Sequence, residues 1–239
     1  MPFLFWKDTT MDRLFRKTLV FFTLGAIAIL CLGCSDNKSI VATGQIAGSG
    51  RIVSQVRAAA GFTGIEVTNT TKVIITQDTV ESLRIEVDDN ILDRVTTTVT
   101  GGVLRVGLQE GSYNNVTFRV YVSMVNINLL ESTGAADFSA TGPISVGEIV
   151  CRITGAGTVT LWGTATSETV EIIGAGSIRN LGLVTPRCTA LISGAGDIQV
   201  HVTEQLDAVI SGTGSIVYAG DPPTVHSIIT GLGNVSPQK

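Results

Sequence analysis

The sequence predicts an all-β protein that folds as a right-handed parallel β-helix, a solenoid with rungs of about 20 residues. Three observations lead to this prediction. A glycine motif recurs at a nearly constant spacing in the second half of the chain, apolar and polar residues alternate around it, and no convincing amphipathic helix follows residue 34. In addition, Thr, Val and Ile are abundant and 27 of the 239 residues are glycine, which favours strands joined by tight turns.

The repeated motif reads STGAADF, TGAGTV, IGAGSI, SGAGDI, SGTGSI and TGLGNV between residues 132 and 235. Its leading glycines are spaced by 18 to 21 residues: Gly134, Gly155, Gly174, Gly194, Gly212 and Gly231. From the second copy on, an Ile stands two residues before each leading glycine and an Ile or Val stands four residues after it. Alternation with period two places these apolar residues inside the coil. We expect the glycines to face the interior at a pinched corner, where a side chain would not fit.

Two ligand-binding interpretations of the glycine motif do not fit its context. A phosphate or dinucleotide loop needs a helix after the glycines, whereas here a strand pattern follows every copy. The calcium-binding glycine repeat has nine residues and an aspartate in each copy, whereas this repeat has about 20 residues and carries Asp only at Asp137 and Asp197. The motif therefore predicts a structural corner and no cofactor.

The region 50–130 also shows alternating strand patterns, but its spacing is shorter and less regular than that of residues 131–236. Two interpretations remain open: irregular rungs of the same solenoid, or a sheet that caps its end. An uncovered end rung would be an aggregation-prone edge, so some cap is expected.

The N-terminus predicts export. Basic residues at positions 7–17 precede an uncharged apolar run, as in a secretory signal peptide, here residues 1–33. The end of the run, CLGC (31–34), resembles the bacterial lipobox, which implies lipid attachment at Cys34 and cleavage after Gly33. A plain anchor helix is the alternative. Residues 34–49 are small and polar and predict a flexible tether between the lipid and the domain. Translation starts at Met1 or Met11.

Charge and composition exclude several partners. Residues 34–239 hold 12 basic and 18 acidic residues and show no basic stripe, so nucleic acid is not an expected partner. The two histidines, His201 and His226, have no Asp or Cys at metal-like spacing, so no metal site is expected. Cys151 and Cys188 fall about two rungs apart, nearly 10 Å, and are expected to be buried free thiols.

No catalytic set stands out. Arg152 and Glu171 fall on neighbouring rungs and predict a surface ion pair. An enzyme would need a carboxylate cluster from the first half: Glu81, Glu86, Asp88, Asp89 and Asp93. The candidate binding face is a column of outward polar residues three positions after each leading glycine: Thr158, Ser177, Asp197, Ser215 and Asn234. This column, the +3 ladder, suits an extended glycan and equally suits a solvated sheet face. An outward apolar trio, Leu191, Val209 and Ile228, suggests contact with an envelope protein or a homo-oligomer.

The segment FTGIEVTNTTKVIITQDTVESLRIEVDDNILDRVTTTVTGGVLRVGL, followed by serial G-x-G-x-[IV] rungs, resembles the bacterial family "putative auto-transporter adhesin, head GIN domain" over residues 50–236. The resemblance implies one exported, often lipid-anchored β-helical domain. The expected function is therefore a non-catalytic binding or structural module of the cell envelope, adhesin-like, held at the membrane by its N-terminal lipid. Ser35 after the lipid site suggests the outer membrane. The alternative is a polysaccharide-modifying β-helix enzyme, a lyase or hydrolase.

Overall fold

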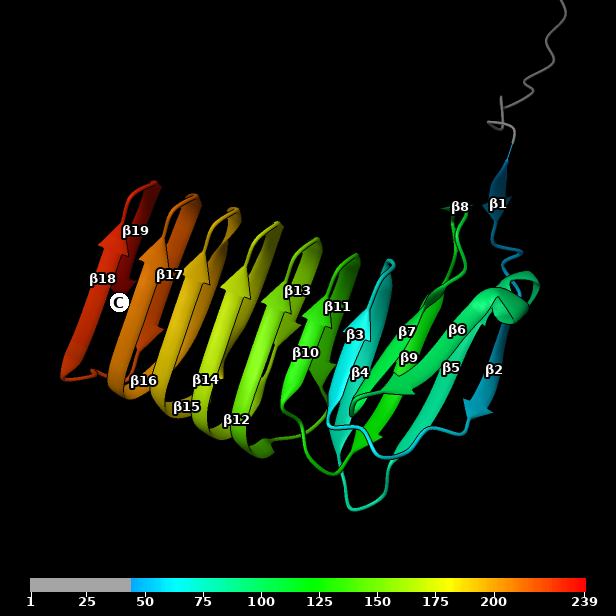
Figure 1. Cartoon of the computed structure of the whole chain (residues 1–239), viewed down its shortest axis with the longest axis horizontal. Helices are drawn as coiled ribbons and strands as arrows, with labels where there is room; N and C mark the ends of the chain where they lie inside the picture. The colour runs from blue at the N-terminus through cyan, green and yellow to red at the C-terminus, as the bar shows by residue number, and fades with distance from the viewer. Residues whose placement is uncertain (1–43) are drawn as a thin grey trace, which may run out of the picture. The chain divides into compact units, whose positions relative to one another are not determined.

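The computed structural model describes residues 44–239, where every regular element is a β-strand except one 3-10 helix (Figure 1). The expected signal peptide (1–33), the lipid site Cys34 and most of the expected tether (34–49) lie outside the described residues. Residues 44–239 all belong to one compact unit. No helix in this range is long and apolar enough to cross a membrane.

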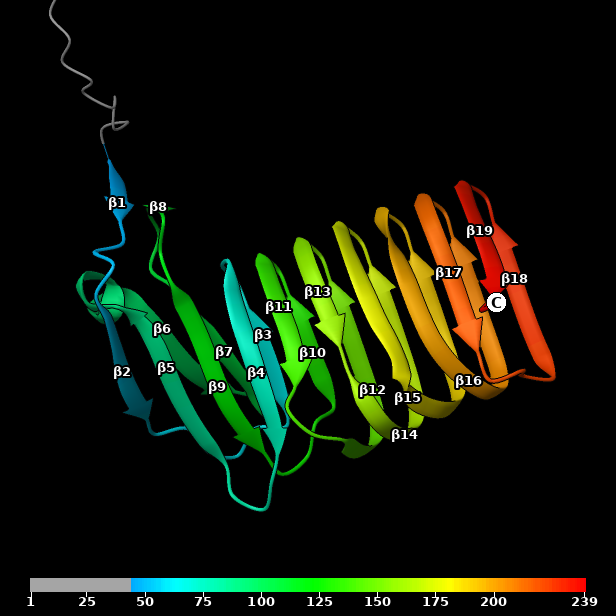
Figure 2. The same ribbon diagram turned by 180° about the vertical axis from the view of Figure 1, so that it is seen from behind.

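The second half of the chain is a β-solenoid with rungs of about 20 residues, which confirms the predicted architecture. The right hand predicted for the coil remains a prediction. Strands of successive rungs pair in parallel and in register, and the longest ones continue around a bend from one rung into the next (Figures 1 and 2). The strands are β10 (Leu129–Ser132), β11 (Ala135–Ala140), β12 (Ile144–Ile153), β13 (Ala156–Thr160), β14 (Trp162–Ile172), β15 (Ala175–Ile192), β16 (Ala195–Ile210), β17 (Thr213–Ala219), β18 (Thr224–Ile229) and β19 (Leu232–Pro237).

The core consists of apolar columns that run along the stack, as the alternation predicts. One column follows the isoleucines before each corner, from Ile153 to Ile210, and these residues are at most 1% exposed. A second column follows the Ile or Val after each corner, from Val159 to Ile216, and is fully buried. Burial of each such side chain contributes about 1.5–3 kcal/mol, so stacking the rungs is what stabilises the fold.

The glycine corners are confirmed, but the atoms that a side chain at the leading glycines would meet differ from the prediction. A Cβ atom on Gly194 would lie 2.0 Å from the carbonyl oxygen of Gly174, the leading glycine of the preceding rung. The leading glycines are therefore required because one corner stacks directly on the next, and not because they face the interior. The second glycine meets both neighbours: a Cβ on Gly196 would lie 2.3 Å from the carbonyl oxygen of Gly176 on the preceding rung and 3.2 Å from the Ile172 side chain in the core.

The first half contains both solenoid rungs and a cap. β3 (Gly64–Val67) and β4 (Thr71–Gln77) stack in parallel on β10 and β11. On the opposite side of β3 and β4, β7 (Val103–Leu108) and β9 (Phe118–Met124) also stack in parallel. The order of the rungs along the stack therefore differs from their order in the chain. The remaining bounds are β1 (Gln45–Ala47), β2 (Ile52–Arg57), β5 (Ser82–Asp88), η1 (Asp89–Arg94), β6 (Val95–Thr100) and β8 (Ser112–Asn114).

The cap closes the end of the stack that carries the first half. β5 and β6 pair antiparallel with β9 and β7, and β2 pairs antiparallel with β5. The helix η1 buries Ile91 completely, and Arg57 of β2 donates hydrogen bonds to the carbonyl oxygens of Val95 (2.7 Å) and Leu92 (3.3 Å). Residues 45–47 form strand β1 beside β8, so ordered structure begins within the segment 34–49 that was expected to be a flexible tether.

The two cysteines of the described chain are free and buried, as predicted. Cys151 stacks on Val170, whereas Cys188 stacks on Glu168, so the two thiols occupy different columns as well as different rungs. Burial raises the pKa of both thiols well above the usual value, which makes them unreactive.

Candidate functional site

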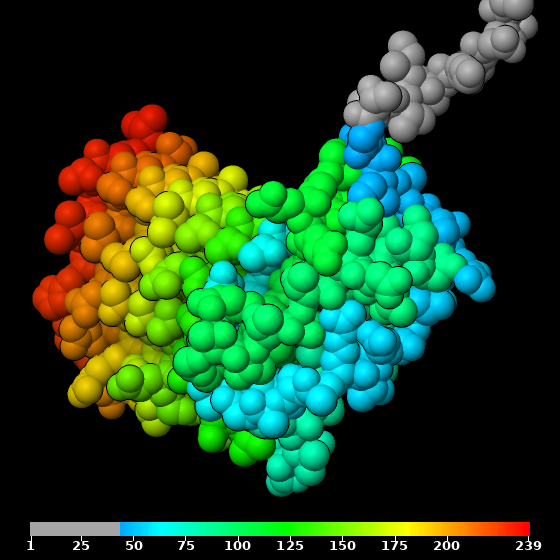
Figure 3. Space-filling model, turned by 45° about the vertical axis from the view of Figure 1, so that its right-hand side comes forward, coloured from blue at the N-terminus to red at the C-terminus, as the bar shows by residue number. Residues whose placement is uncertain are grey.

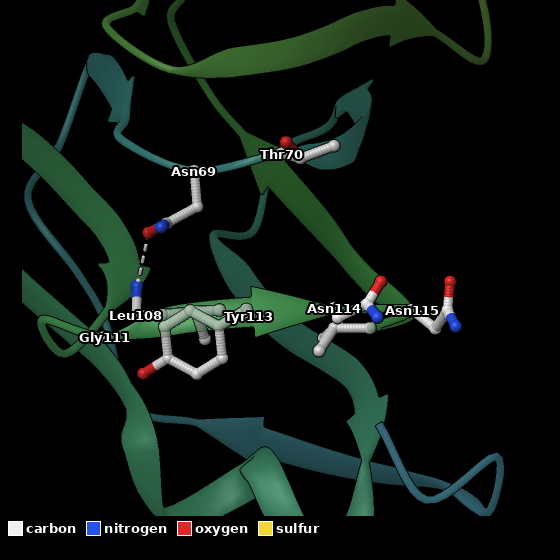
Figure 4. A pocket seen from close by; sticks show the side chains of 8 residues that line it. Asn69, Thr70, Leu108, Gly111, Tyr113, Asn114 and Asn115 are labelled. Atoms are coloured by element: carbon white, nitrogen blue, oxygen red, sulfur yellow. Dashed lines mark hydrogen bonds between the residues drawn. The ribbon is translucent and has the colours of Figure 1, made fainter. Parts of the chain in front are cut away.

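A pocket of about 390 Å³ lies between the β3–β4 turn and the arm that carries β8 (Figure 4). We call it the amide pocket, because three asparagines line it together with Tyr113 and other residues; the full lining is Asn69, Thr70, Leu108, Gly111, Tyr113, Asn114, Asn115 and Val116. Half-buried Leu108, Tyr113 and Val116 supply apolar surface, whereas Asn114 and Asn115 are exposed. Apolar and aromatic surface with a few placed amide groups is typical of a site for a small polar ligand.

The polar groups of the amide pocket are held in defined orientations. The carbonyl oxygen of the Asn69 side chain accepts hydrogen bonds from the Leu108 backbone N–H (2.6 Å) and the Thr68 hydroxyl (3.1 Å). Its amide nitrogen is therefore left as a donor at the pocket. The Tyr113 hydroxyl donates to the carbonyl oxygen of Gln109 (2.7 Å), which fixes the ring. Asn115 has a left-handed backbone (φ 51°), a conformation that asparagine tolerates well.

A buried aspartate holds the arm that forms one side of the amide pocket. β8 pairs with β1 in this arm, and Asp88 lies beneath it at 1% exposure. Its two oxygens accept hydrogen bonds from the Gly50 backbone N–H (2.6 Å) and the Thr117 backbone N–H (2.7 Å). The carboxylate thus ties together the segments that follow β1 and β8, and we assign it a positioning role.

A second pocket of about 250 Å³ shares Thr70 and Val116 with the first, so the two pockets adjoin, and together we call them the groove. We call it the basic pocket, because exposed Lys72 and Arg119 line it, with Asp137 beside them. In the space-filling view the surface is indented between the end that carries β1 and β8 and the stacked rungs (Figure 3). The groove therefore offers amide, aromatic and basic groups next to one another.

The +3 ladder starts at the basic pocket. Arg119, Lys72 and Asp137 stand in register on β9, β4 and β11, and the same column continues along the rungs through Thr158, Ser177, Asp197, Ser215 and Asn234. Asp197 accepts a hydrogen bond from the Ser215 hydroxyl (2.6 Å), which links these two ladder residues. The predicted column thus exists as one row of polar groups that leads away from the groove, and its role in binding stays a prediction.

Four of the five acidic residues that an enzyme would need make structural contacts. Glu81 accepts hydrogen bonds from the backbone N–H groups of Gly61 (2.7 Å) and Phe62 (3.3 Å). Glu86 contacts Arg84, Arg119 and the Tyr121 hydroxyl, and its hydrogen bond with Arg84 lowers its pKa. Asp89 binds Ser49 and Arg51, which lower its pKa, Asp88 holds the arm, and Asp93 is exposed on η1.

The ion pair and the apolar trio predicted from the sequence also lie on one outward column of the stack. Arg152 and Glu171 form the predicted ion pair (2.7 Å), and Glu131 lies 3.8 Å from the same guanidinium. Leu191, Val209 and Ile228 follow Glu171 in that outward column. Among residues 44–239, no three His, Cys, Asp or Glu side chains come close enough to hold a metal ion.

The amide pocket was missed by sequence reasoning. Its residues come from the β3–β4 turn and from the segment around β8, which are far apart in the chain, so no local spacing brings them together. The available signal was compositional: TNTT (68–71) and SYNNV (112–116) gather amides, hydroxyls and one aromatic residue outside the regular strand patterns.

Comparison with known proteins agrees with this architecture. A family described as "Putative auto-transporter adhesin, head GIN domain" matches residues 61–222. A solved structure of a "putative adhesin" from Bacteroides fragilis is 22% identical, with a TM-score of 0.63 over 81% of this chain and 100% of that chain. A "Putative lipid binding protein" from Parabacteroides distasonis is 19% identical, with a TM-score of 0.54 over 82% and 100%. None of the curated proteins matches. At these identities the structural likeness concerns the fold.

Proposed function

Because this chain belongs to the family described as "Putative auto-transporter adhesin, head GIN domain", we propose that it is a non-catalytic, adhesin-like module that binds glycans. In this proposal the protein is exported and held in the bacterial envelope, at the outer membrane, by a lipid on Cys34. The observation that carries the proposal is the amide pocket, with Tyr113 and three asparagines, next to the basic pocket from which the +3 ladder starts.

A glycan fits the chemistry of this surface. A sugar ring presents hydroxyl groups at its edge and C–H groups on its faces, so it suits amide donors and acceptors beside an aromatic ring. The amide pocket would hold one or two sugar units, and the ladder would contact the units that follow. Lys72 and Arg119 in the basic pocket would favour a chain with carboxylate or sulfate groups.

The binding experiment uses residues 41–239, the compact unit with its own core. This unit is incubated with a panel of polysaccharides and envelope glycans, and both retention and glycan chain length are measured. We expect retention of at least one glycan without shortening. Tyr113→Ala and Asn114→Ala should weaken its binding at least about tenfold, the effect of losing one well-placed contact. Asn126→Ala, which removes an exposed asparagine outside the groove, is the matched control and should bind normally.

Two outcomes would contradict the proposal in different ways. Shortening of a glycan would support the polysaccharide-modifying enzyme instead, and would direct mutagenesis to the acidic residues of the first half. Retention that Tyr113→Ala and Asn114→Ala leave unchanged would move the binding site away from the groove.

The proposed lipid anchor is tested separately in cells. Cys34→Ala should release the full chain from the membrane fraction, because no lipid can then be attached. Continued retention in the membrane would point to the alternative, an uncleaved anchor helix.

A further inference from the structure

Within residues 44–239, the rung formed by β18 and β19 leaves its core open. Val225 and Ile229 of β18 are 39% and 43% exposed, although Leu206 and Ile210, their neighbours in the same columns on β16, are fully buried. Leu232, at the start of β19, is 80% exposed. This rung is the end of the stack farthest from the cap (Figure 1). The apolar columns therefore end at an exposed surface and not at a covered one.

The same rung presents two open strand edges. Among residues 44–239, β18 pairs only with β16 and β19 pairs only with β17, so one edge of each strand has backbone N–H and C=O groups without a strand partner. Natural edge strands usually carry charges that prevent further pairing. The segment TVHSIITGLGNVSP (224–237) contains no Asp, Glu, Lys or Arg. The opposite end of the stack is closed by η1 and by the hydrogen bonds of Arg57.

We propose that two copies of this chain associate tail to tail through their last rungs. The open end consists of two strands on facing walls with an apolar interior between them. A single peptide strand would cover only one of the two edges. A second terminal rung, related by a two-fold axis, covers both edges and the interior at once, with each strand antiparallel to a strand of the other copy.

Charge and topology favour a second copy of this chain as the partner at the open end. The chain carries a net charge of −4, so two copies repel each other over most of their surface. The terminal rung has no acidic residue, so the electrostatic repulsion between two copies is smallest there. At the capped end the edge strands are β2 and β6, and η1 and Arg57 close the interior there. Head-to-tail stacking would therefore set the open interior of one copy against a closed end and would not join two open interiors. The association therefore closes at a dimer and does not continue into a fibre.

The size of the interface sets the expected affinity. Each terminal strand has six residues, so the rung end measures about 20 Å along the strands and about 10 Å between the walls. The end face therefore covers about 200 Å² on each copy, well below the roughly 800 Å² per partner of a standard specific interface, so we expect weak association with a dissociation constant on the order of 0.1–1 mM. The dimer would hold its two grooves at opposite ends, and this inference does not depend on what the grooves bind.

The test is sedimentation equilibrium of residues 41–239 from about 10 µM to about 1 mM, a range that reaches dissociation constants of about 0.1–1 mM. We expect a reversible shift from monomer to dimer and no larger species. Leu232→Lys places a charge against the apolar end surface of the other copy and should leave only monomer. The matched control is Val56→Lys, which changes a 75% exposed valine on the edge strand β2 of the cap. This control should dimerise like the wild type, and circular dichroism verifies that both variants fold.

Hydrogen exchange gives a second readout that needs no substitution. The amides of β18 and β19 should exchange more slowly at high than at low protein concentration, while those of β2 and β6 should not change. Three results would overturn the inference: monomer at every concentration, equal loss of dimer in both variants, or growth beyond the dimer.

Discussion

Replacing Glu168 with Gln should remove a pH-dependent loss of stability. Glu168 lies on an inward column between Ile149 and Cys188 and is only 2% exposed. One of its oxygens accepts a hydrogen bond from the Asn180 amide at 2.6 Å, and the other, Oε2, has no hydrogen-bond partner among the described residues. Burial raises the pKa of this carboxyl from 4.5 to about 7, although the hydrogen bond from Asn180 opposes the rise.

The direction of the effect follows from which state holds the proton. Below pH 4.5 the carboxyl is protonated in both the folded and the unfolded chain, so the raised pKa has no consequence for stability. Between pH 4.5 and about 7 the unfolded chain releases the proton while the folded chain keeps it, so the free energy of unfolding falls as pH rises. A factor of ten in acid equilibrium corresponds to about 1.4 kcal/mol. The raised pKa therefore implies a total loss of about 3 kcal/mol, which is complete above pH 7.

The assay is chemical denaturation of residues 41–239 at intervals between pH 4 and pH 8. The quantity compared is the difference in unfolding free energy between Glu168→Gln and the wild type. It should grow in favour of the variant by about 3 kcal/mol from pH 4 to pH 8, whatever constant offset the buried amide introduces. The matched control is Glu148→Gln on the preceding rung, where the side chain is exposed.

A difference that stays constant across this pH range would refute the reasoning. It would mean that Glu168 ionises normally in the folded chain, through water or movement of the rung. An equal change in Glu148→Gln would show that the pH dependence does not arise from the buried carboxyl.

Two further predictions concern the arm and the corners. Asp88→Asn should lower the unfolding free energy by about 1–3 kcal/mol, because an amide nitrogen cannot accept the hydrogen bond from Gly50 or Thr117; urea denaturation measures this, and an unchanged midpoint would contradict the positioning role. Gly194→Ala should cost at least about 2 kcal/mol, because its Cβ would lie 2.0 Å from a backbone oxygen, whereas Gly142→Ala, with nothing within 4 Å, should stay within about 1 kcal/mol of the wild type. Thermal unfolding compares the pair, and equal midpoints would contradict the stacked-corner explanation.

The second half of the fold was predictable because the pattern that determines it lies within about 20 residues and is repeated. A fixed spacing with period-two alternation determines both the rung and the inward side, so the isoleucine columns, the +3 ladder and the Arg152–Glu171 pair all lie where the alignment of the repeats puts them. Glu168 also stands at an inward position of this alternation, six residues before Gly174, so its burial was open to prediction from the same pattern.

The first half was less predictable because its order in space differs from its order in the chain. The rung of β3 and β4 lies between β10–β11 and β7–β9. No local pattern indicates that β7 and β9 stack on one side of this rung before the chain continues on the other side at β10. The amide pocket depends on this order, since it brings Asn69 near Asn114. The corner glycines were identified correctly. Their close contact, however, is with the corner of the preceding rung, and the sequence of a single rung does not indicate how closely two corners stack.

The central claim is that the groove beginning at the amide pocket binds a glycan. The most direct measurement is titration of ¹⁵N-labelled residues 41–239 with the glycan that retains the protein, followed through the side-chain amide signals of asparagine. The signals of Asn69, Asn114 and Asn115 should shift with a common dissociation constant, while that of Asn126 stays in place. If those three signals stay in place while signals elsewhere shift, or if no glycan in the panel is retained, the claim is wrong.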